Sequence, residues 1–288
     1  MHIPQPGEVS FPSGEVRPAL GLGTWRMGEE PARRHAETAA LRLALEIGWR
    51  VIDTAEMYGN GGAERVCGQA LAEAQTAGLS RSELFVVSKV LPHNASQAGV
   101  LAACEASLRR LRLDCIDLYL LHWRGTVALE QTVRGFETLQ RRGWIRHWGV
   151  SNFDIDDMRE LGEVPGGKAC AANQVYFSLG ARGVEFDLLP WQRLQQMPLM
   201  AYCPFDQGRL ASHPGLLAVA DRHGVRPAQV ALAWLLRQPG VMPIPKASTE
   251  AHLHDNWAAQ AIRLTEQDLV DIDRNFPPPR GKQNLAMR

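Results

Sequence analysis

The segment 84-LFVVSKVLPHNASQAGVLAACEASLRRLRLDCIDLYLLH-122 contains one complete strand–helix–strand unit. Its ends, LFVVS at 84–88 and CIDLYLL at 115–121, are short apolar runs of the kind that form buried strands. Between them, SQAGVLAACEASLRRL repeats apolar residues at intervals of three and four, which predicts a helix with Ser96 as its N-cap. A helix that connects two such strands predicts a parallel sheet.

The same alternation continues from residue 19 to the end of the chain. Strands are expected at 19–23, 50–53, 84–88, 115–121, 145–150, 171–175, 198–202 and 241–244. The segment 206–215 breaks the pattern and is expected to be a longer loop after the seventh strand, and Ser82 is expected to cap a helix. Eight units predict an α/β fold of the (β/α)8 TIM barrel type, formed by a single domain over 1–288, with an N-terminal β-hairpin within 1–18 that closes the barrel bottom.

The composition argues against several classes of partner. Lys plus Arg (31) balance Asp plus Glu (31), so no overall field attracts nucleic acid or an anionic membrane. The N-terminus lacks the pattern of a secretory signal and no segment is long enough to span a bilayer, which favours a cytoplasmic location. Five scattered cysteines without CxxC spacing favour reduced thiols, and no metal site is expected. Without heptads or an exposed apolar stripe, a monomer is expected.

Polar residues stand where the predicted strands end. They are Asp53, Lys89, His122, Ser151, Asn152, Gln174, Tyr202 and Lys246. Each alone has an ordinary structural explanation, such as a helix cap or a solvated charge. In a closed barrel, however, the C-terminal strand ends converge on the face where active sites of this fold lie. The shared position of these residues therefore predicts one functional site.

Several motifs resemble the aldo-keto reductases. They are DTAEMYG (53–59), VVSKV (86–90), LLHW (120–123), GVSNF (149–153), NQV (173–175) and IPKAS (244–248), and the similarity runs from GLGTW (21–25) to RLTEQDL (263–269). The stretches DTAEMYGNGGAE and GARGVEFDLLPW look closest to bacterial members that reduce methylglyoxal and related small carbonyls. The resemblance implies an oxidoreductase that reduces small aldehydes and ketones to alcohols with NADPH.

The resemblance also implies a catalytic tetrad of Asp53, Tyr58, Lys89 and His122. Reduction of a carbonyl builds negative charge on its oxygen, so the site needs a proton donor there. Tyr58 is expected to be the donor, because a lysine beside a tyrosine, whose ordinary pKa is about 10, favours the phenolate. His122 is expected to orient the substrate oxygen, although it could itself be the acid.

By the same resemblance, the cofactor would be held by residues from several strand ends. They are Thr24, Asp53, Ser151, Asn152, Gln174, Tyr202, Pro204, Phe205 and Gly208, with Lys246, Ala247 and Ser248 at the ribose 2′-phosphate and His252 and Asn256 beyond them. His252 stands where relatives often carry arginine, and a histidine is only partly charged near neutral pH. This departure predicts weaker retention of the phosphate and more use of NADH than in a typical relative.

Trp25, Tyr58, His122 and Trp123 are expected to contact the substrate in an apolar pocket. Two other classes of function stay open. One is a non-enzymatic NADP(H)-binding barrel that acts as a redox sensor or accessory subunit, although the presence of all four tetrad residues argues against it. The other is a metal-dependent hydrolase, which would need more clustered ligands than one histidine at a strand end. The physiological carbonyl and the reaction direction are left open.

Overall fold

The computed structural model describes residues 7–287, and these divide into two compact units. One unit contains residues 22–173 and 246–248; the other contains the described residues up to 21, 174–245 and those from 249 onward. Residues 1–6 and 288 of the predicted domain lie outside the described residues. That the chain forms a single domain stays a prediction.

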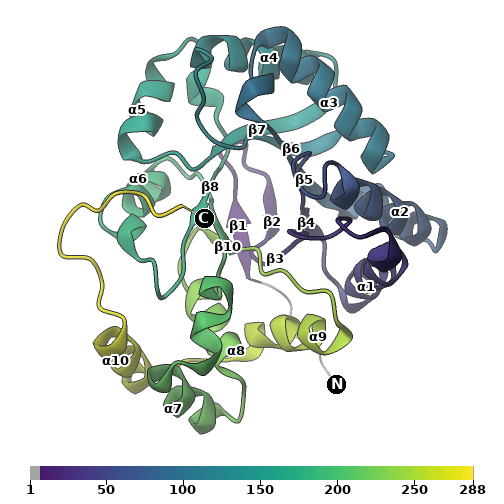
Figure 1. The fold of residues 1–288 in the computed structure, drawn as a ribbon. Helices are drawn as coiled ribbons and strands as arrows, with labels where there is room; N and C mark the ends of the chain where they lie inside the picture. Colours follow the sequence, from purple (N-terminus) through teal and green to yellow (C-terminus); the bar gives the residue numbers. More distant parts are fainter. Residues whose placement is uncertain (1–6, 288) are drawn as a thin grey trace. The chain divides into compact units, whose positions relative to one another are not determined.

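In the unit that contains residues 22–173, strands and helices alternate along the chain (Figure 1). The strands are β3 (Gly21–Gly23), β4 (Val51–Asp53), β5 (Phe85–Val90), β6 (Ile116–Leu121) and β7 (Ile145–Ser151). The helices are α1 (Arg34–Ile47), α2 (Gly62–Thr76), α3 (Gln97–Leu111), α4 (Leu129–Arg141) and α5 (Ile155–Glu163). The pairs β4–β5, β5–β6 and β6–β7 are all parallel, so the C-terminal ends of these strands share one edge.

The second unit begins with an antiparallel hairpin of β1 (Glu8–Ser10) and β2 (Val16–Pro18). Its turn is closed by a hydrogen bond from the Phe11 N–H to the Glu15 carbonyl, 2.8 Å, and contains Gly14 at φ 82°. An α-left conformation of this kind favours glycine, since a Cβ would crowd the backbone. The predicted N-terminal hairpin is confirmed.

The rest of the second unit contains three more strands and five helices in its described residues. They are β8 (Asn173–Tyr176), β9 (Leu199–Tyr202), β10 (Val241–Pro243), α6 (Leu188–Leu194), α7 (Pro214–His223), α8 (Pro227–Leu236), α9 (Glu250–Ala258) and α10 (Glu266–Asn275). Strands β9 and β10 pair in parallel. The segment after β9 is not a plain loop, because Asp206–Ser212 forms 3₁₀ turns and α7 begins at Pro214.

All eight predicted strands are present, each within a few residues of its expected bounds. Ser96 caps α3 as predicted, since its Oγ accepts from the Gly99 N–H at 3.1 Å. The expected cap at Ser82 is wrong. Ser80 caps the 3₁₀ turn Arg81–Glu83, because its side chain and that of Glu83 satisfy each other's backbone N–H groups in a capping box.

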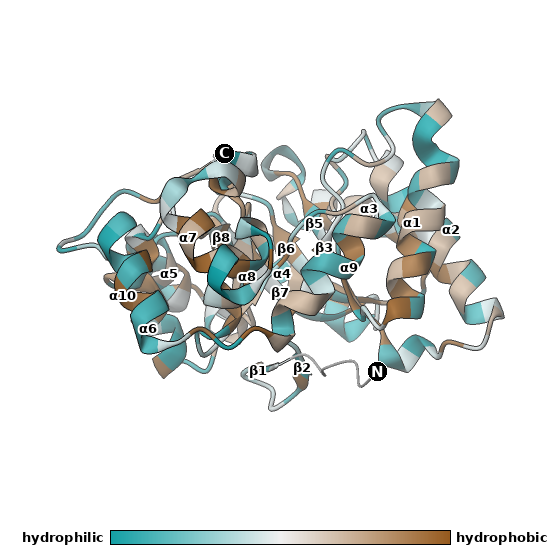
Figure 2. Cartoon of the chain, turned by 90° about the horizontal axis from the view of Figure 1, so that it is seen from below, coloured by the Kyte–Doolittle hydropathy of each residue, from teal (hydrophilic) through white to brown (hydrophobic). Residues whose placement is uncertain are grey.

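Large apolar side chains fill the interior of the unit with residues 22–173, where Trp49, Phe85 and Trp148 are fully buried. Phe136 of α4 stacks on Trp148 of β7 with ring centroids 5.2 Å apart. Helices such as α1 mix hydrophilic and hydrophobic residues (Figure 2), as expected of helices with one buried face. The strand ends that carry polar residues are thus held by a rigid apolar core.

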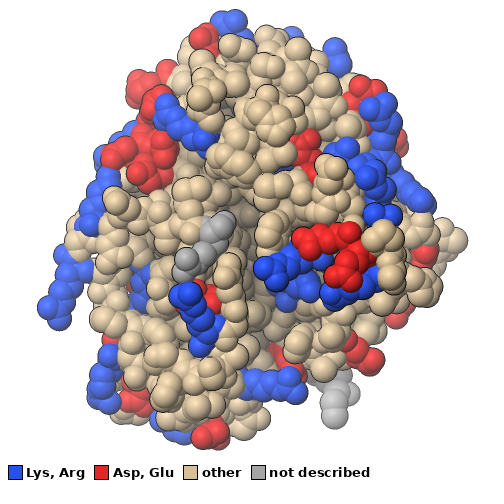
Figure 3. All heavy atoms as spheres, viewed as in Figure 1, with Lys and Arg blue, Asp and Glu red and all other residues tan. Residues whose placement is uncertain are grey.

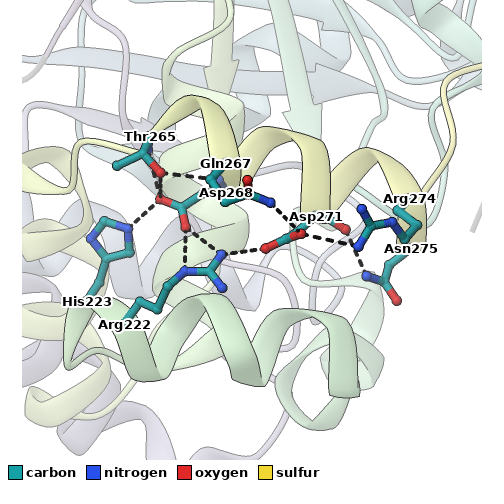
Figure 4. A network of polar contacts seen from close by, with 8 residues as sticks. All are labelled: Arg222, His223, Thr265, Gln267, Asp268, Asp271, Arg274 and Asn275. Carbon is teal, nitrogen blue, oxygen red and sulfur yellow. Dashed lines mark hydrogen bonds and ion pairs between the residues drawn. The ribbon is translucent and has the colours of Figure 1, made fainter.

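In the other unit, a polar network joins α7 to α10 (Figure 4). Asp268 is 1% exposed and accepts hydrogen bonds from the Arg222 guanidinium at 2.6 and 2.9 Å and from Thr265 Oγ1 at 2.8 Å. His223 Nε2 lies 2.7 Å from the same carboxylate. Burial raises the pKa of Asp268, but the hydrogen bonds from His223, Thr265 and Arg222 outweigh it and lower this pKa below its ordinary value.

Candidate active site

The ammonium of Lys89 is the centre of the candidate site. Lys89 follows four apolar or small residues of β5 and is fully buried. Its Nζ donates to Asp53 Oδ1 and Oδ2 at 2.9 and 2.8 Å and to the Thr54 carbonyl at 2.9 Å. The neighbouring strand β4 ends at Asp53, so parallel pairing alone brings the two charges together. Burial lowers the pKa of Lys89, and Asp53 opposes this effect.

Tyr58 lies on the turn between β4 and α2, with its hydroxyl 3.2 Å from Lys89 Nζ. Its ring is buried, and Lys89 Nζ lies 4.8 Å from the ring centroid. The turn depends on a close backbone approach, since a Cβ added at Gly28 would lie 2.1 Å from the Gly62 carbonyl carbon. Glycines at both positions therefore let the turn pack tightly enough to place the phenol over Lys89.

His122 directly follows β6, and its ring centroid lies 5.8 Å from that of Tyr58. Burial, reinforced by the positive charge of Lys89, lowers the pKa of His122 to about 2. The imidazole is therefore neutral near pH 7. Its buried Nδ1 has no hydrogen-bond partner among residues 7–287, so one ring nitrogen of His122 is not committed to the protein.

Two tryptophans extend the aromatic surface at Tyr58 and His122. Trp25 contacts the Tyr58 ring edge to face at 4.9 Å, and Trp123 lies 4.8 Å from the His122 ring. Trp25 is 44% exposed, which is high for a side chain of its size. The predicted substrate-contacting residues Trp25 and Trp123 are therefore neighbours of Tyr58 and His122.

Three predicted cofactor residues of this unit have clear structural contacts. Asn152, at φ 61°, donates from Nδ2 to the His122 carbonyl and to Ser151 Oγ, both at 3.1 Å. Thr24 is fully buried, and its Oγ1 donates to the Asp53 carbonyl at 3.0 Å. These contacts join the ends of β3, β4, β6 and β7. Whether the same residues also touch a cofactor stays a prediction.

Lys246, Ala247 and Ser248 belong to this unit as well, because the backbone of Lys246 pairs in parallel with Gly23 beside β3. Lys246 is half-buried and donates from Nζ to Ser248 Oγ at 2.8 Å. Burial and then the charge of Arg33 lower the pKa of Lys246. Figure 3 shows basic and acidic side chains gathered where Figure 1 places α1 and the segment before it. Within the described chain no carboxylate lies within ion-pair distance of Lys246.

The remaining predicted cofactor residues belong to the other unit. They are Gln174, Tyr202, Pro204, Phe205, Gly208, His252 and Asn256. The Tyr202 ring stacks on Tyr176, with centroids 5.7 Å apart, and the Tyr176 hydroxyl bonds to Asp206. Cys203, Asp206 and Gln207 all have positive φ, so the segment after Tyr202 is tightly turned. His252 is exposed in the first turn of α9, and Asn256 is buried.

Sequence reasoning missed Glu64, a fully buried carboxylate on α2. It accepts from Ser88 Oγ at 2.6 Å and is bonded by Arg110 Nε. A signal for it exists in the sequence, because Glu64 shares the buried face of α2 with Cys67, Gly68 and Leu71. A charged residue on the apolar face of a helix is unusual unless it is paired.

Neither thiols nor metal ligands stand out as alternative chemistry. The five cysteines, all within residues 7–287, form no disulfide, and burial raises the pKa of Cys67 and Cys170 to about 12. Such thiols are poor nucleophiles. Within residues 7–287, His, Cys, Asp and Glu form no group of three or more that could hold a metal ion.

Comparison with known proteins identifies close relatives of the chain. The model of the "Aldo/keto reductase family" matches residues 19–275. The chain is 51% identical over 283 residues to methylglyoxal reductase YeaE of Escherichia coli (strain K12), covering 96% of this chain and 97% of the relative. It is 35% identical to a glyoxal reductase of Bacillus subtilis, covering 92% and 91%.

A solved structure resembles the whole chain. The aldo/keto reductase of Klebsiella pneumoniae in complex with NADP and acetate superposes with a TM-score of 0.93 at 46% identity, covering 98% of this chain and 100% of that chain. The chain therefore has the (β/α)8 barrel fold of these proteins, as its sequence predicts.

Proposed function

Because this chain belongs to the aldo/keto reductase family, we propose that it reduces small aldehydes and ketones to alcohols with NADPH. The observation that carries the proposal is the Tyr58 hydroxyl 3.2 Å from the buried, charged Lys89, with neutral His122 beside it. A proton donor and a hydrogen-bonding group thus face one place, where a carbonyl oxygen would gain charge. Methylglyoxal and glyoxal, the substrates named for two relatives, are the proposed substrate class.

Tyr58 acts as the proton donor, and Lys89 stabilises the phenolate that remains. Two charge-assisted hydrogen bonds to Asp53 hold the ammonium in place, so it is already oriented when the proton leaves. His122 is a poor candidate for the acid, since a group with a pKa of about 2 carries no extra proton at neutral pH. The neutral imidazole of His122 is proposed instead to bind and orient the substrate oxygen.

The residues present fit NADPH, which supplies the hydride when bound. Lys246 is a half-buried lysine that forms no ion pair with a carboxylate of residues 7–287, although the charges of Glu37 and Glu29 act on it, and the Ser248 hydroxyl lies 2.8 Å from it. A phosphate group would give this lysine a directly bonded anionic partner. Ser151, Asn152 and Gln174 are proposed to bind the carboxamide, Tyr202 to stack on the ring, and the segment Pro204–Gly208 to line the phosphates. Because His252 stands where relatives often carry arginine, NADH is proposed as a second, weaker cofactor.

We also propose that the protein works as a monomer in the cytoplasm. Within residues 7–287, each helix is too short or too polar to cross a bilayer. Large exposed hydrophobic side chains such as Trp25, Leu194 and Val270 come from different segments. Light scattering on the purified protein tests whether it is a monomer, and a mass of twice 31.9 kDa would contradict this.

Loss of cofactor absorbance tests the function directly. Wild-type protein and Tyr58→Phe are compared with NADPH or NADH and a panel of small aldehydes led by methylglyoxal. Turnover by the wild type alone, with NADPH binding by fluorescence retained in the variant, supports the reductase with Tyr58 as acid. Tight NADPH binding without turnover of any carbonyl would support a redox sensor or accessory subunit instead.

A further inference from the structure

Behind Lys89, on the other side of β5, lies a second buried carboxylate. Ser88 and Lys89 are consecutive in the strand, so their side chains point to opposite faces. Lys89 faces Asp53 and Tyr58, whereas Ser88 Oγ donates to Glu64 Oε1 of α2 at 2.6 Å. Ser88 and Glu64 are both fully buried. The strand that carries the ammonium is therefore held from behind by a hydrogen bond to a carboxylate.

Arg110, near the end of α3, balances this carboxylate. Its Nε donates to Glu64 Oε2, and its Nη2 donates to Ser107 Oγ at 3.1 Å. Gly68 makes the contact possible, because a Cβ there would lie 2.4 Å from the Arg110 carbonyl oxygen and would push α2 away from α3. The absence of a side chain at Gly68 thus lets the guanidinium reach Glu64.

The same arginine supports the turn that carries Tyr58. A Cβ added at Gly61 would lie 2.6 Å from Arg110 Cδ, so the aliphatic part of Arg110 packs directly under this turn. Gly61 has φ 77°, which favours glycine in any case. The Ser88–Glu64–Arg110 contacts therefore touch the supports of both Lys89 and Tyr58 without touching the reacting groups.

Glu64 also acts on Lys89 through its charge. Burial lowers the pKa of Lys89, and two carboxylates oppose this, first Asp53 and then Glu64. The groups that face Lys89 are Asp53, Tyr58 and His122. Ser88 and Arg110 hydrogen-bond Glu64, and its charge also acts on Cys67, Cys104 and Tyr119. Among these, Arg110 is the cation that offsets Glu64.

We propose that Glu64, fixed by Ser88 and Arg110, is a positioning residue that keeps Lys89 charged and in register with Tyr58. The inference rests on the proposed function in one respect, since it assigns Tyr58 the role of proton donor. Glu64 contributes through Lys89 and contacts no reacting atom. Removing its charge should therefore change the pH dependence of the reaction and the ionisation of Tyr58, and should leave cofactor binding unchanged.

Glu64→Gln tests the proposal, because it retains the shape of the side chain and removes its charge. Loss of a nearby negative charge makes both Lys89 and Tyr58 lose their protons at lower pH. We expect the alkaline limb of the kcat profile for methylglyoxal reduction to move down by about half a pH unit to one unit. The Kd for NADPH stays within about twofold of the wild type, a difference of under about 0.5 kcal/mol.

Two further variants separate charge from stability. Asp117→Asn is the matched control, since Asp117 is also fully buried and paired with an arginine, Arg81, but lies at the start of β6. It should lower the melting temperature and leave the alkaline limb in place. Arg110→Met leaves the Glu64 carboxylate without its cation, so the limb should move to higher pH. This second variant also tests the proposal if Glu64→Gln does not fold.

Ultraviolet titration gives a readout that needs no turnover. The difference between wild type and Tyr58→Phe isolates one of the four tyrosines, and the same difference in the Glu64→Gln background should ionise at lower pH. Unchanged titration and an unchanged limb in a folded Glu64→Gln protein would overturn the role of Glu64. If Asp117→Asn shifted the Tyr58 titration and the alkaline limb as much as Glu64→Gln does, the role of Glu64 would also be refuted. A wild type that reduces no carbonyl refutes the proposed function alone, because the titration still reports on Glu64.

Discussion

Lys89→Met should damage stability and activity for different reasons. The ammonium makes three hydrogen bonds of 2.8 to 2.9 Å to Asp53 and Thr54 in a fully buried position. Removing it leaves the Asp53 carboxylate buried without a counter-charge, which costs about 3–5 kcal/mol of unfolding free energy. Replacing both charges should be far milder, so Asp53→Asn/Lys89→Met is expected within about 2 kcal/mol of the wild type.

The reverse single variant, Asp53→Asn, should be less harmful than Lys89→Met. Burial already lowers the pKa of Lys89, so a lysine without its partner can release its proton and become neutral. We expect a loss of about 1–3 kcal/mol. Urea unfolding followed by circular dichroism at pH 7 measures all three proteins against the wild type.

Activity should not follow stability in this series. Both variants without Lys89 should lose about 10²–10⁴-fold in kcat, because nothing then stabilises the Tyr58 phenolate. The double variant would thus be stable and inactive. A Lys89→Met protein as stable as the wild type, or a double variant no more stable than the single one, would refute the claim that a buried ion pair holds this site together.

Four other expectations follow from the geometry. Nitrogen NMR should show that His122 stays neutral from pH 5 to 8, since its pKa is about 2. The unfolding free energy should fall as pH drops below about 6.5, because the unfolded chain then binds a proton at His122 and the folded protein does not. Asp268→Asn should cost about 1–3 kcal/mol at pH 7, because it removes the carboxylate that His223 contacts and one of the two carboxylates that Arg222 bonds, the other being Asp271. The lowered pKa of Asp268 means that this contribution is present at neutral pH and is lost as pH falls below about 4, so the variant and the wild type should converge in acid. Gly28→Ala should lower the unfolding free energy by about 2–4 kcal/mol, because the new Cβ would meet the Gly62 backbone. Gly224 has a similar φ of 64° but open space around it, so Gly224→Ala should cost only about 1 kcal/mol, and thermal unfolding compares the two variants. Lys246→Met should weaken NADPH about 10–100-fold by fluorescence titration and leave NADH nearly unchanged; equal losses for both cofactors would contradict a role at the 2′-phosphate.

The strands and the contact between Asp53 and Lys89 could be predicted because both depend on local order. Apolar runs separated by helical patterns define the eight strands, and parallel pairing then brings their polar C-terminal ends to one edge. Asp53 ends β4 and Lys89 lies near the end of β5, so their contact needs no further information. The sequence does not distinguish a cap at Ser80 from one at Ser82, because Ser80 precedes the turn Arg81–Glu83 and Ser82 lies within it, and hydrogen-bond geometry decides between them.

Contacts between helices could not be predicted from the sequence, and Glu64 illustrates the reason. Its position on the buried face of α2 can be recognised from the sequence, but its partner cannot. That partner is Arg110, 46 residues later, and it is selected by how closely α2 and α3 approach at Gly68. Arg109 stands next to Arg110 in the sequence, yet it bonds Glu105 on the exposed side of α3. A rotation of α3 by one residue would exchange the two arginines, so the charge balance behind Lys89 is set by helix packing, whereas the contact between Asp53 and Lys89 is set by strand order.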